Sequence, residues 1–189
     1  MSMSIGPIHY WLYKKIDNQE ELTAFIAEEA KKNGWISDTS AYTKELPALE
    51  SVIDERNIHG WLQGQIADAE KRYASLISAT DDHMDILKRT AFAFGKQHQV
   101  PSGANAEEIY QYFEDFFLNG MPCDRVNEVT EQAEDKVSWQ MNQDIHAEYW
   151  AEEKSEEYYE LRKAVMDGML DDTDFNVEMQ DLYRYTLGR

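Results

Sequence analysis

The sequence has few of the residues that form disulfide bonds or turns, and it has no long apolar segment. A single cysteine, Cys123, excludes an internal disulfide bond and any metal or iron–sulfur site built from thiolates alone. Four prolines and nine glycines in 189 residues are too few for a turn-rich barrel or a long flexible linker. No run of about 18 apolar residues occurs, so we expect no transmembrane helix and no membrane partner.

Basic residues are also scarce. Lys and Arg total 18 against 37 Asp and Glu, which gives a formal net charge of −19. Because nucleic-acid affinity comes mainly from basic side chains that displace counterions from phosphates, we expect no nucleic-acid partner. The acidic residues cluster at 152–157 and 171–174. Such runs are usually solvated surface, and the alternative is that they receive a basic protein or peptide.

The first residues predict the compartment of the protein, and the length predicts the number of domains. Residues 1–7 lack the basic segment and the apolar stretch of a secretory signal, so we expect a cytoplasmic protein. A chain of 189 residues with 42% apolar residues is expected to form one domain, residues 1–189, with a sizeable core. A homodimer and a monomer are the two alternatives for its assembly.

Apolar residues recur at helical spacing through most of the chain. Pro7 suits the first turn of a helix, and Asn105 suits the cap of another. The segment 173–183 carries Phe175, Met179 and Leu182 and is interpreted as a last short helix. The other predicted helices span 7–33, 46–78 with a break near 54–57, 80–98, 105–119 and 152–169.

The period changes after residue 135. Val137, Trp139 and Met141 alternate with polar residues, which indicates a strand. A lone strand leaves its backbone groups unpaired, so the segment 124–130 is the nearest candidate partner. We therefore predict a mainly α fold, a helical bundle with a small antiparallel β-hairpin near residues 124–145.

Two of the predicted helices begin alike. Ile-His-x-Trp-Leu occurs at 8–12 and again at 58–62, and Ile16 and Ile66 extend the match. Two core-facing helices that converged on similar residues would explain this repeat as well as a duplication would. A single pair of segments is too short for a solenoid, which needs about three units.

The histidines suggest a metal site. Glu55 precedes His59 by one helical turn, which would place both side chains on the same face. Helix lengths place His59 and His98 at one level if their helices are antiparallel. His9 joins that level if the first two long helices run parallel, and His146 follows the predicted strand. We therefore predict that these five residues bind a divalent metal such as Zn or Fe; the alternative is that they are solvated or hydrogen-bonded structural residues.

His9, His59 and His98 on successive long helices, with Glu55 beside His59, give residues 7–118 a resemblance to the hemerythrin-like and DinB-like helical bundles. The resemblance implies a metal held inside a helical bundle. Those families rely on histidine pairs four residues apart, and this chain has none. What the resemblance implies is therefore a single metal ion rather than a diiron centre.

Trp11 and Trp61 flank these histidines and are candidates to line a ligand pocket; the alternative, which such aromatic residues more often follow, is that they belong to the core. Gly60 and Gly64 follow His59, and each costs about 1 kcal/mol of helix propensity against alanine, which suggests that space is needed there. The predicted function is binding of a metal ion or small ligand, with metal-assisted hydrolysis as one possible use of the site. The alternative is a non-enzymatic, acidic partner-binding or chaperone-like protein.

Overall fold

The computed structural model describes residues 5–150 and 154–189. Its contacts divide the chain into two compact units, and each unit is described by itself. Within the described ranges helices predominate over strands, in agreement with the predicted mainly α class. Unit 1 is Met1–Thr80 with Phe116–Asp124, and unit 2 is Asp81–Asp115 with Arg125–Arg189.

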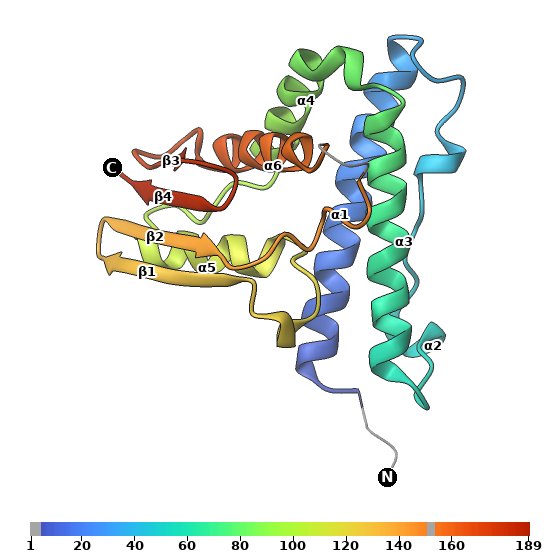
Figure 1. Cartoon of the computed structure of the whole chain (residues 1–189), viewed down its shortest axis with the longest axis horizontal. Helices are drawn as coiled ribbons and strands as arrows, with labels where there is room; N and C mark the ends of the chain where they lie inside the picture. Colours follow the sequence, from blue (N-terminus) through green and yellow to red (C-terminus); the bar gives the residue numbers. More distant parts are fainter. Residues whose placement is uncertain (1–4, 151–153) are drawn as a thin grey trace. The chain divides into compact units, whose positions relative to one another are not determined.

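Unit 1 is built on two long helices. Helix α1 (Pro7–Lys32) and helix α3 (Ile58–Ser78) lie side by side and run in the same direction (Figure 1). The connection between them carries the short helix α2 (Leu49–Val52) and a 3₁₀ turn, Ser40–Tyr42. The predicted break before residue 58 is confirmed, because Asn57 caps α3 by accepting the Gly60 N–H at 3.2 Å.

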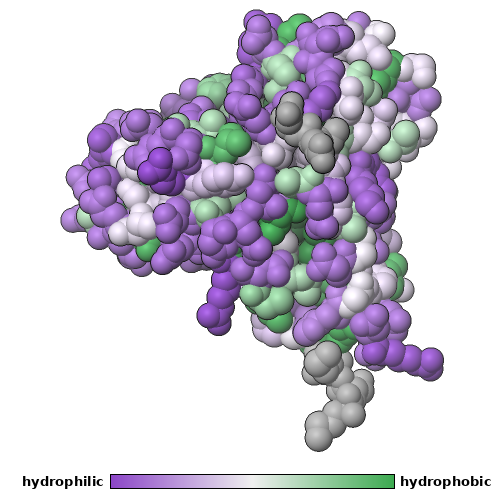
Figure 2. Space-filling view, viewed as in Figure 1, coloured by the Kyte–Doolittle hydropathy of each residue, from purple (hydrophilic) through white to green (hydrophobic). Residues whose placement is uncertain are grey.

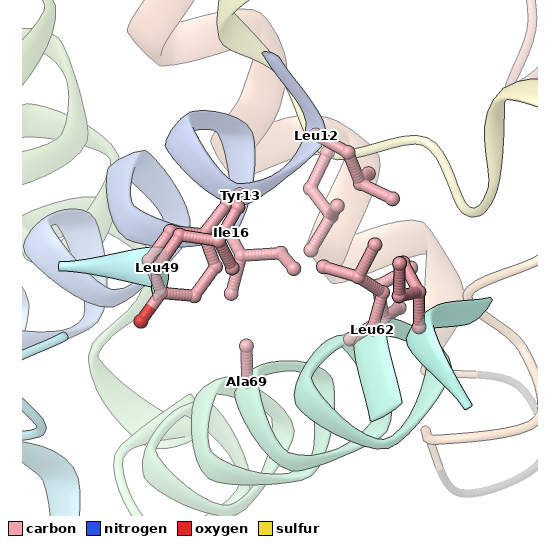
Figure 3. Close-up of a cluster of buried hydrophobic side chains, with 9 residues drawn as sticks. Leu12, Tyr13, Ile16, Leu49, Leu62 and Ala69 are labelled. Atoms are coloured by element: carbon pink, nitrogen blue, oxygen red, sulfur yellow. The ribbon is translucent and has the colours of Figure 1, made fainter. Parts of the chain in front are cut away.

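The core of unit 1 joins equivalent positions of the two repeated segments. Leu12 and Ile16 of α1 and Leu62 and Ile66 of α3 are all buried in one cluster (Figure 3). Parallel helices that start at the same level place matched residues opposite one another. The repeat in the sequence is therefore two apolar stripes that face each other. The other buried members of the cluster are Tyr13, Leu49, Ile58, Ala69 and Leu118.

Unit 2 contains helices α4 (Met84–Lys96), α5 (Ala106–Phe116) and α6 (Ser155–Leu170). The cap predicted for α5 is confirmed and is reciprocal. Asn105 Oδ1 accepts the Glu108 N–H at 2.9 Å, and Glu108 Oε2 accepts the Asn105 N–H at 2.9 Å. The predicted start of the last long helix at residue 152, and the acidic residues 152 and 153, lie outside the described residues.

Helices α4 and α6 cross in backbone contact. A Cβ atom added to Gly95 would lie 2.1 Å from the Val165 carbonyl oxygen. A Cβ atom added to Gly168 would lie 2.1 Å from the Phe92 carbonyl oxygen. Since real Cβ atoms do not approach so closely, the crossing requires glycine on both helices.

The predicted hairpin is confirmed and belongs to a larger sheet. Strand β1 (Asn127–Ala133) pairs with β2 (Lys136–Met141) in antiparallel register. Strands β3 (Asn176–Met179) and β4 (Arg184–Gly188) form a second hairpin, and β4 pairs with β2. Within the described residues the sheet has the order β1-β2-β4-β3.

The second hairpin corrects the predicted short helix near residues 173–183. Val177, Tyr185 and Leu187 are buried at alternate positions of their strands, while their neighbours are exposed or half-buried. The Tyr185 ring stacks on the Trp139 ring of β2 with centroids 5.4 Å apart. Pairing with β2 thus fixes these residues as strands, and no pattern within the segment itself shows that pairing.

The face of the molecule drawn in Figure 2 is mostly polar. Hydrophilic residues cover most of the face drawn in Figure 2, with small hydrophobic areas between them. Among the helices of the described residues, none is both long enough and apolar enough to cross a membrane.

Candidate functional sites

The structure brings two of the predicted metal ligands together. The His9 and His59 rings lie at the starts of α1 and α3, with centroids 5.9 Å apart and ring planes at 40°. The condition set by the sequence, that the two long helices run parallel from the His9 end, is therefore met. His9 is half-buried and His59 is exposed.

The His9 ring is oriented by the backbone of the chain entering α1. Its Nδ1 atom accepts the Gly6 N–H at 2.9 Å, so the neutral ring carries its hydrogen on Nε2. A metal ion at Nε2 would move that hydrogen to Nδ1 and displace the Gly6 contact. Losing one such hydrogen bond costs about 0.5–1.5 kcal/mol. Metal binding by His9 is thus opposed by the cap of its own helix.

Glu55 does not have the position that the sequence suggested. Helix α3 begins at Ile58, and Asn57 is its cap, so Glu55 lies in the chain before the helix. The one-turn spacing to His59 therefore does not apply. Glu55 is exposed.

The two tryptophans belong partly to the core of unit 1. Trp11 and Trp61 are half-buried and pack against its apolar cluster. The Lys15 ammonium lies 4.0 Å from the centroid of the Trp11 ring, and the Tyr13 ring lies 5.9 Å from that of Trp61. These contacts account for both side chains as edges of the core.

The two glycines of α3 have separate explanations. A Cβ atom on Gly60 would lie 2.3 Å from the Asn57 side chain, which caps the helix. A Cβ atom on Gly64 would meet nothing within 4 Å. Gly60 thus makes room for the cap, and Gly64 faces open space.

The other two predicted ligands lie in unit 2. The His98 ring packs against Phe94, with centroids 4.4 Å apart, just beyond the end of α4. His146 is fully buried, and its ring stacks on Tyr158 at 3.7 Å. Across residues 5–150 and 154–189, no group of three or more His, Cys, Asp or Glu side chains is placed to hold a metal ion.

A polar cluster that the sequence did not indicate surrounds Arg162 of α6. Arg162 is buried, and the Tyr159 hydroxyl donates to Asp144 at 2.7 Å. Burial and the Asp144 carboxylate hold the Tyr159 pKa far above its ordinary value. Burial also raises the Tyr185 pKa to about 12, although Arg162 opposes that rise. These tyrosines stay protonated at neutral pH, so they act as hydrogen-bond donors in the core of unit 2.

A cavity of about 390 Å³ lies at the end of α6 in unit 2. Its apolar wall is formed by Val100, Met169 and Phe175, which are buried. The Val100 N–H donates to the Met169 carbonyl at 3.1 Å and joins the loop after α4 to the end of α6. The polar residues and the remaining small residues of the lining are Gln99, Ser102, Gly103, Ala104, Asp172, Thr173, Asp174 and Arg189.

The charges on this cavity are of both signs. Asp172 accepts a hydrogen bond from Gln99 Nε2 at 2.7 Å. The Arg189 guanidinium stacks over the Phe175 ring, 4.6 Å from its centroid. Within the part of the chain that the structure describes, neither the Asp174 carboxylate nor the Arg189 guanidinium forms an ion pair. Exposed charges of opposite sign, those of Asp174 and Arg189, therefore line one cavity, beside the Asp172 carboxylate.

A second hollow, of about 470 Å³, differs because most of the charged side chains that line it form ion pairs. It lies over α4, α6 and β3 and is lined by several charged side chains. Lys88 pairs with Glu160 and Lys163 pairs with Asp167, each at 2.6 Å. Most of its charge is thus satisfied within the protein.

Only part of the lining of the cavity at the end of α6 is indicated by the sequence. The acidic run 171–174 is evident there, but nothing in the residues of the loop 99–104 indicates that this loop lies beside that run. Comparison of the chain with protein-family models, curated proteins and solved structures finds no match.

Proposed function

We propose that this protein binds a small zwitterionic metabolite of the α-amino acid class in the cavity at the end of α6. The observation that carries the proposal is that Asp174 and Arg189 line the same cavity without an ion-pair partner among the described residues. Arg189 offers a partner to a ligand carboxylate, and Asp174, beside the Asp172 carboxylate, offers a partner to a ligand ammonium group, whereas a singly charged ligand uses only one of these sides. A ligand that carries both charges meets a partner for each.

The volume of the cavity and its apolar wall narrow the class of ligand further. A volume of about 390 Å³ falls near the lower end of the range of about 300–1,000 Å³ typical of small-molecule pockets. Val100, Met169 and Phe175 offer an apolar surface to the part of the ligand between or beside its charges. We therefore favour an amino acid with an apolar or aromatic side chain, and phenylalanine is the probe of choice.

The expected effect of removing either charge is a weaker complex. Asp174→Asn and Arg189→Gln should each lower the affinity for phenylalanine by about 10- to 100-fold. A hydrogen bond to a charged group contributes about 1.5–3 kcal/mol, and 1.4 kcal/mol is a factor of ten. Isothermal titration calorimetry of the parent and both variants measures this directly.

An exposed carboxylate elsewhere in unit 2 provides the matched control. Glu178→Gln removes the same charge from β3, away from the cavity lining, and should leave phenylalanine affinity unchanged. If Glu178→Gln and Asp174→Asn weaken binding equally, overall charge rather than the cavity governs the interaction.

A second candidate function is favoured by the formal charge of −19. We infer that the same acidic protein could dock a Lys- and Arg-rich peptide through long-range attraction. Peptide binding of that kind would fall steeply with salt, since exposed charges are screened within about 10 Å at 0.1 M. Arg189→Gln should leave the affinity for the basic peptide unchanged, whereas it should weaken the binding of a zwitterion.

A further inference from the structure

We propose that His9 and His59 together bind one divalent transition-metal ion, with Zn²⁺ as the test ion, at a site separate from the zwitterion cavity. Both residues belong to unit 1, at the matched starts of two parallel helices. Neutral imidazole is the commonest protein ligand for such ions. The site is thus carried by two nitrogen donors, with water as the remaining ligands.

The distance between the rings suits a shared ion. Zinc binds imidazole nitrogen at about 2.0–2.1 Å, which places two ring centroids about 5 Å apart on a tetrahedral ion. The His9 and His59 centroids are 5.9 Å apart. His59 is exposed and, among the described residues, forms no hydrogen bond or ion pair, so its side chain has room to rotate until one nitrogen of each ring meets the same ion.

The orientation of His9 determines which atom serves as ligand. Its Nδ1 atom faces the Gly6 N–H, so Nε2 is the atom available to an external ion. Because the ion must displace the ring hydrogen from Nε2, the site should favour metals with strong affinity for imidazole. Copper and zinc should bind more tightly than manganese, as the general affinity order of divalent ions requires.

The test is calorimetric titration of metal-free protein with Zn²⁺. The parent should bind one ion per chain, and His59→Ala should lower the affinity at least about tenfold. His83→Ala, in unit 2, is the matched control and should bind as the parent does. His59→Cys supplies a thiolate, which also binds zinc, and should restore most of the affinity.

Several outcomes would overturn the site. One is that the parent binds no stoichiometric zinc, and another is that His59→Ala and His83→Ala lose affinity equally. Failure of His59→Cys to recover affinity would mean that the ring is needed for packing rather than for coordination. Zinc titration of Asp174→Asn keeps the two proposals distinct, because that variant should bind zinc as the parent does even where phenylalanine binding is lost.

Discussion

Gly95→Ala is expected to lower the free energy of unfolding by about 3 kcal/mol. The added Cβ atom would lie 2.1 Å from the Val165 carbonyl oxygen and 3.0 Å from the Gly168 Cα atom. Both neighbours are backbone atoms, so α4 and α6 must move apart as whole helices. Overpacking of a well-packed core typically costs about 1–3 kcal/mol, and a backbone clash belongs at the upper end. Urea unfolding followed by circular dichroism measures the change.

Gly64→Ala is the control for the intrinsic effect of the substitution. Nothing lies within 4 Å of the position that its Cβ would take, and the residue is exposed on α3. Alanine is favoured over glycine in a helix by about 1 kcal/mol, so this variant should be more stable than the parent. A Gly95→Ala protein that matches the parent in stability would show that α4 and α6 do not cross in backbone contact.

Arg72→Met should lower the free energy of unfolding by a similar amount, about 3 kcal/mol. Arg72 Nη1 lies 2.6 Å from Glu20 Oε1, and the Glu20 side chain is only 2% exposed. Removing the guanidinium leaves this carboxylate buried without its counter-ion, which typically costs about 3–5 kcal/mol. Asp68 also contacts Arg72 but keeps its ion pair with Lys44 at 2.6 Å. Lys71→Met, at an exposed position of α3, is the control.

The pH dependence of these variants follows from the Glu20 pKa. Burial raises that pKa above its ordinary value, even though Arg72 opposes the rise. The native state then holds the proton more tightly than the unfolded chain does. The stability from this group is present below the unfolded pKa and is lost as pH rises through the folded value. Without Arg72 the pKa rises further, so the deficit of Arg72→Met should shrink on acidification. Adding Glu20→Gln to Arg72→Met should restore most of the lost free energy of unfolding at neutral pH. If the double variant is as unstable as Arg72→Met alone, the buried Glu20 charge is not the cause of the loss.

The helices of unit 1 were predictable because their signals are local. Pro7 marks the start of α1, the break predicted near residues 54–57 precedes α3, and the stripes containing Leu12 and Leu62 fix the faces that meet. A parallel arrangement of α1 and α3 is the condition under which His9 approaches His59, and the contact between the two rings meets this condition. In unit 1, the spacing of apolar residues within each helix is therefore enough to predict which faces of α1 and α3 pack together.

The second hairpin and the cavity were not predictable in the same way. Residues 173–183 contain few apolar positions, and the spacing of Phe175, Met179 and Leu182, four and then three residues, fits a helix rather than a strand. Their conformation is decided by the pairing of β4 with β2, some 48 residues earlier, as Ser138 and Thr186 illustrate. The cavity depends on a similar long-range contact, and the glycines that matter for packing lie on α4 and α6 rather than on α3.

Recognition of a ligand that carries both charges is the property we propose for the cavity at the end of α6. The most direct measurement is calorimetric titration of the parent protein with phenylalanine, phenethylamine and phenylpropionate, which share a ring but differ in charge. We expect phenylalanine to bind at least about tenfold more tightly than either singly charged analogue, since each analogue leaves one of Asp174 and Arg189 without a partner. Equal affinities for the three compounds, or no binding of phenylalanine, would contradict the claim.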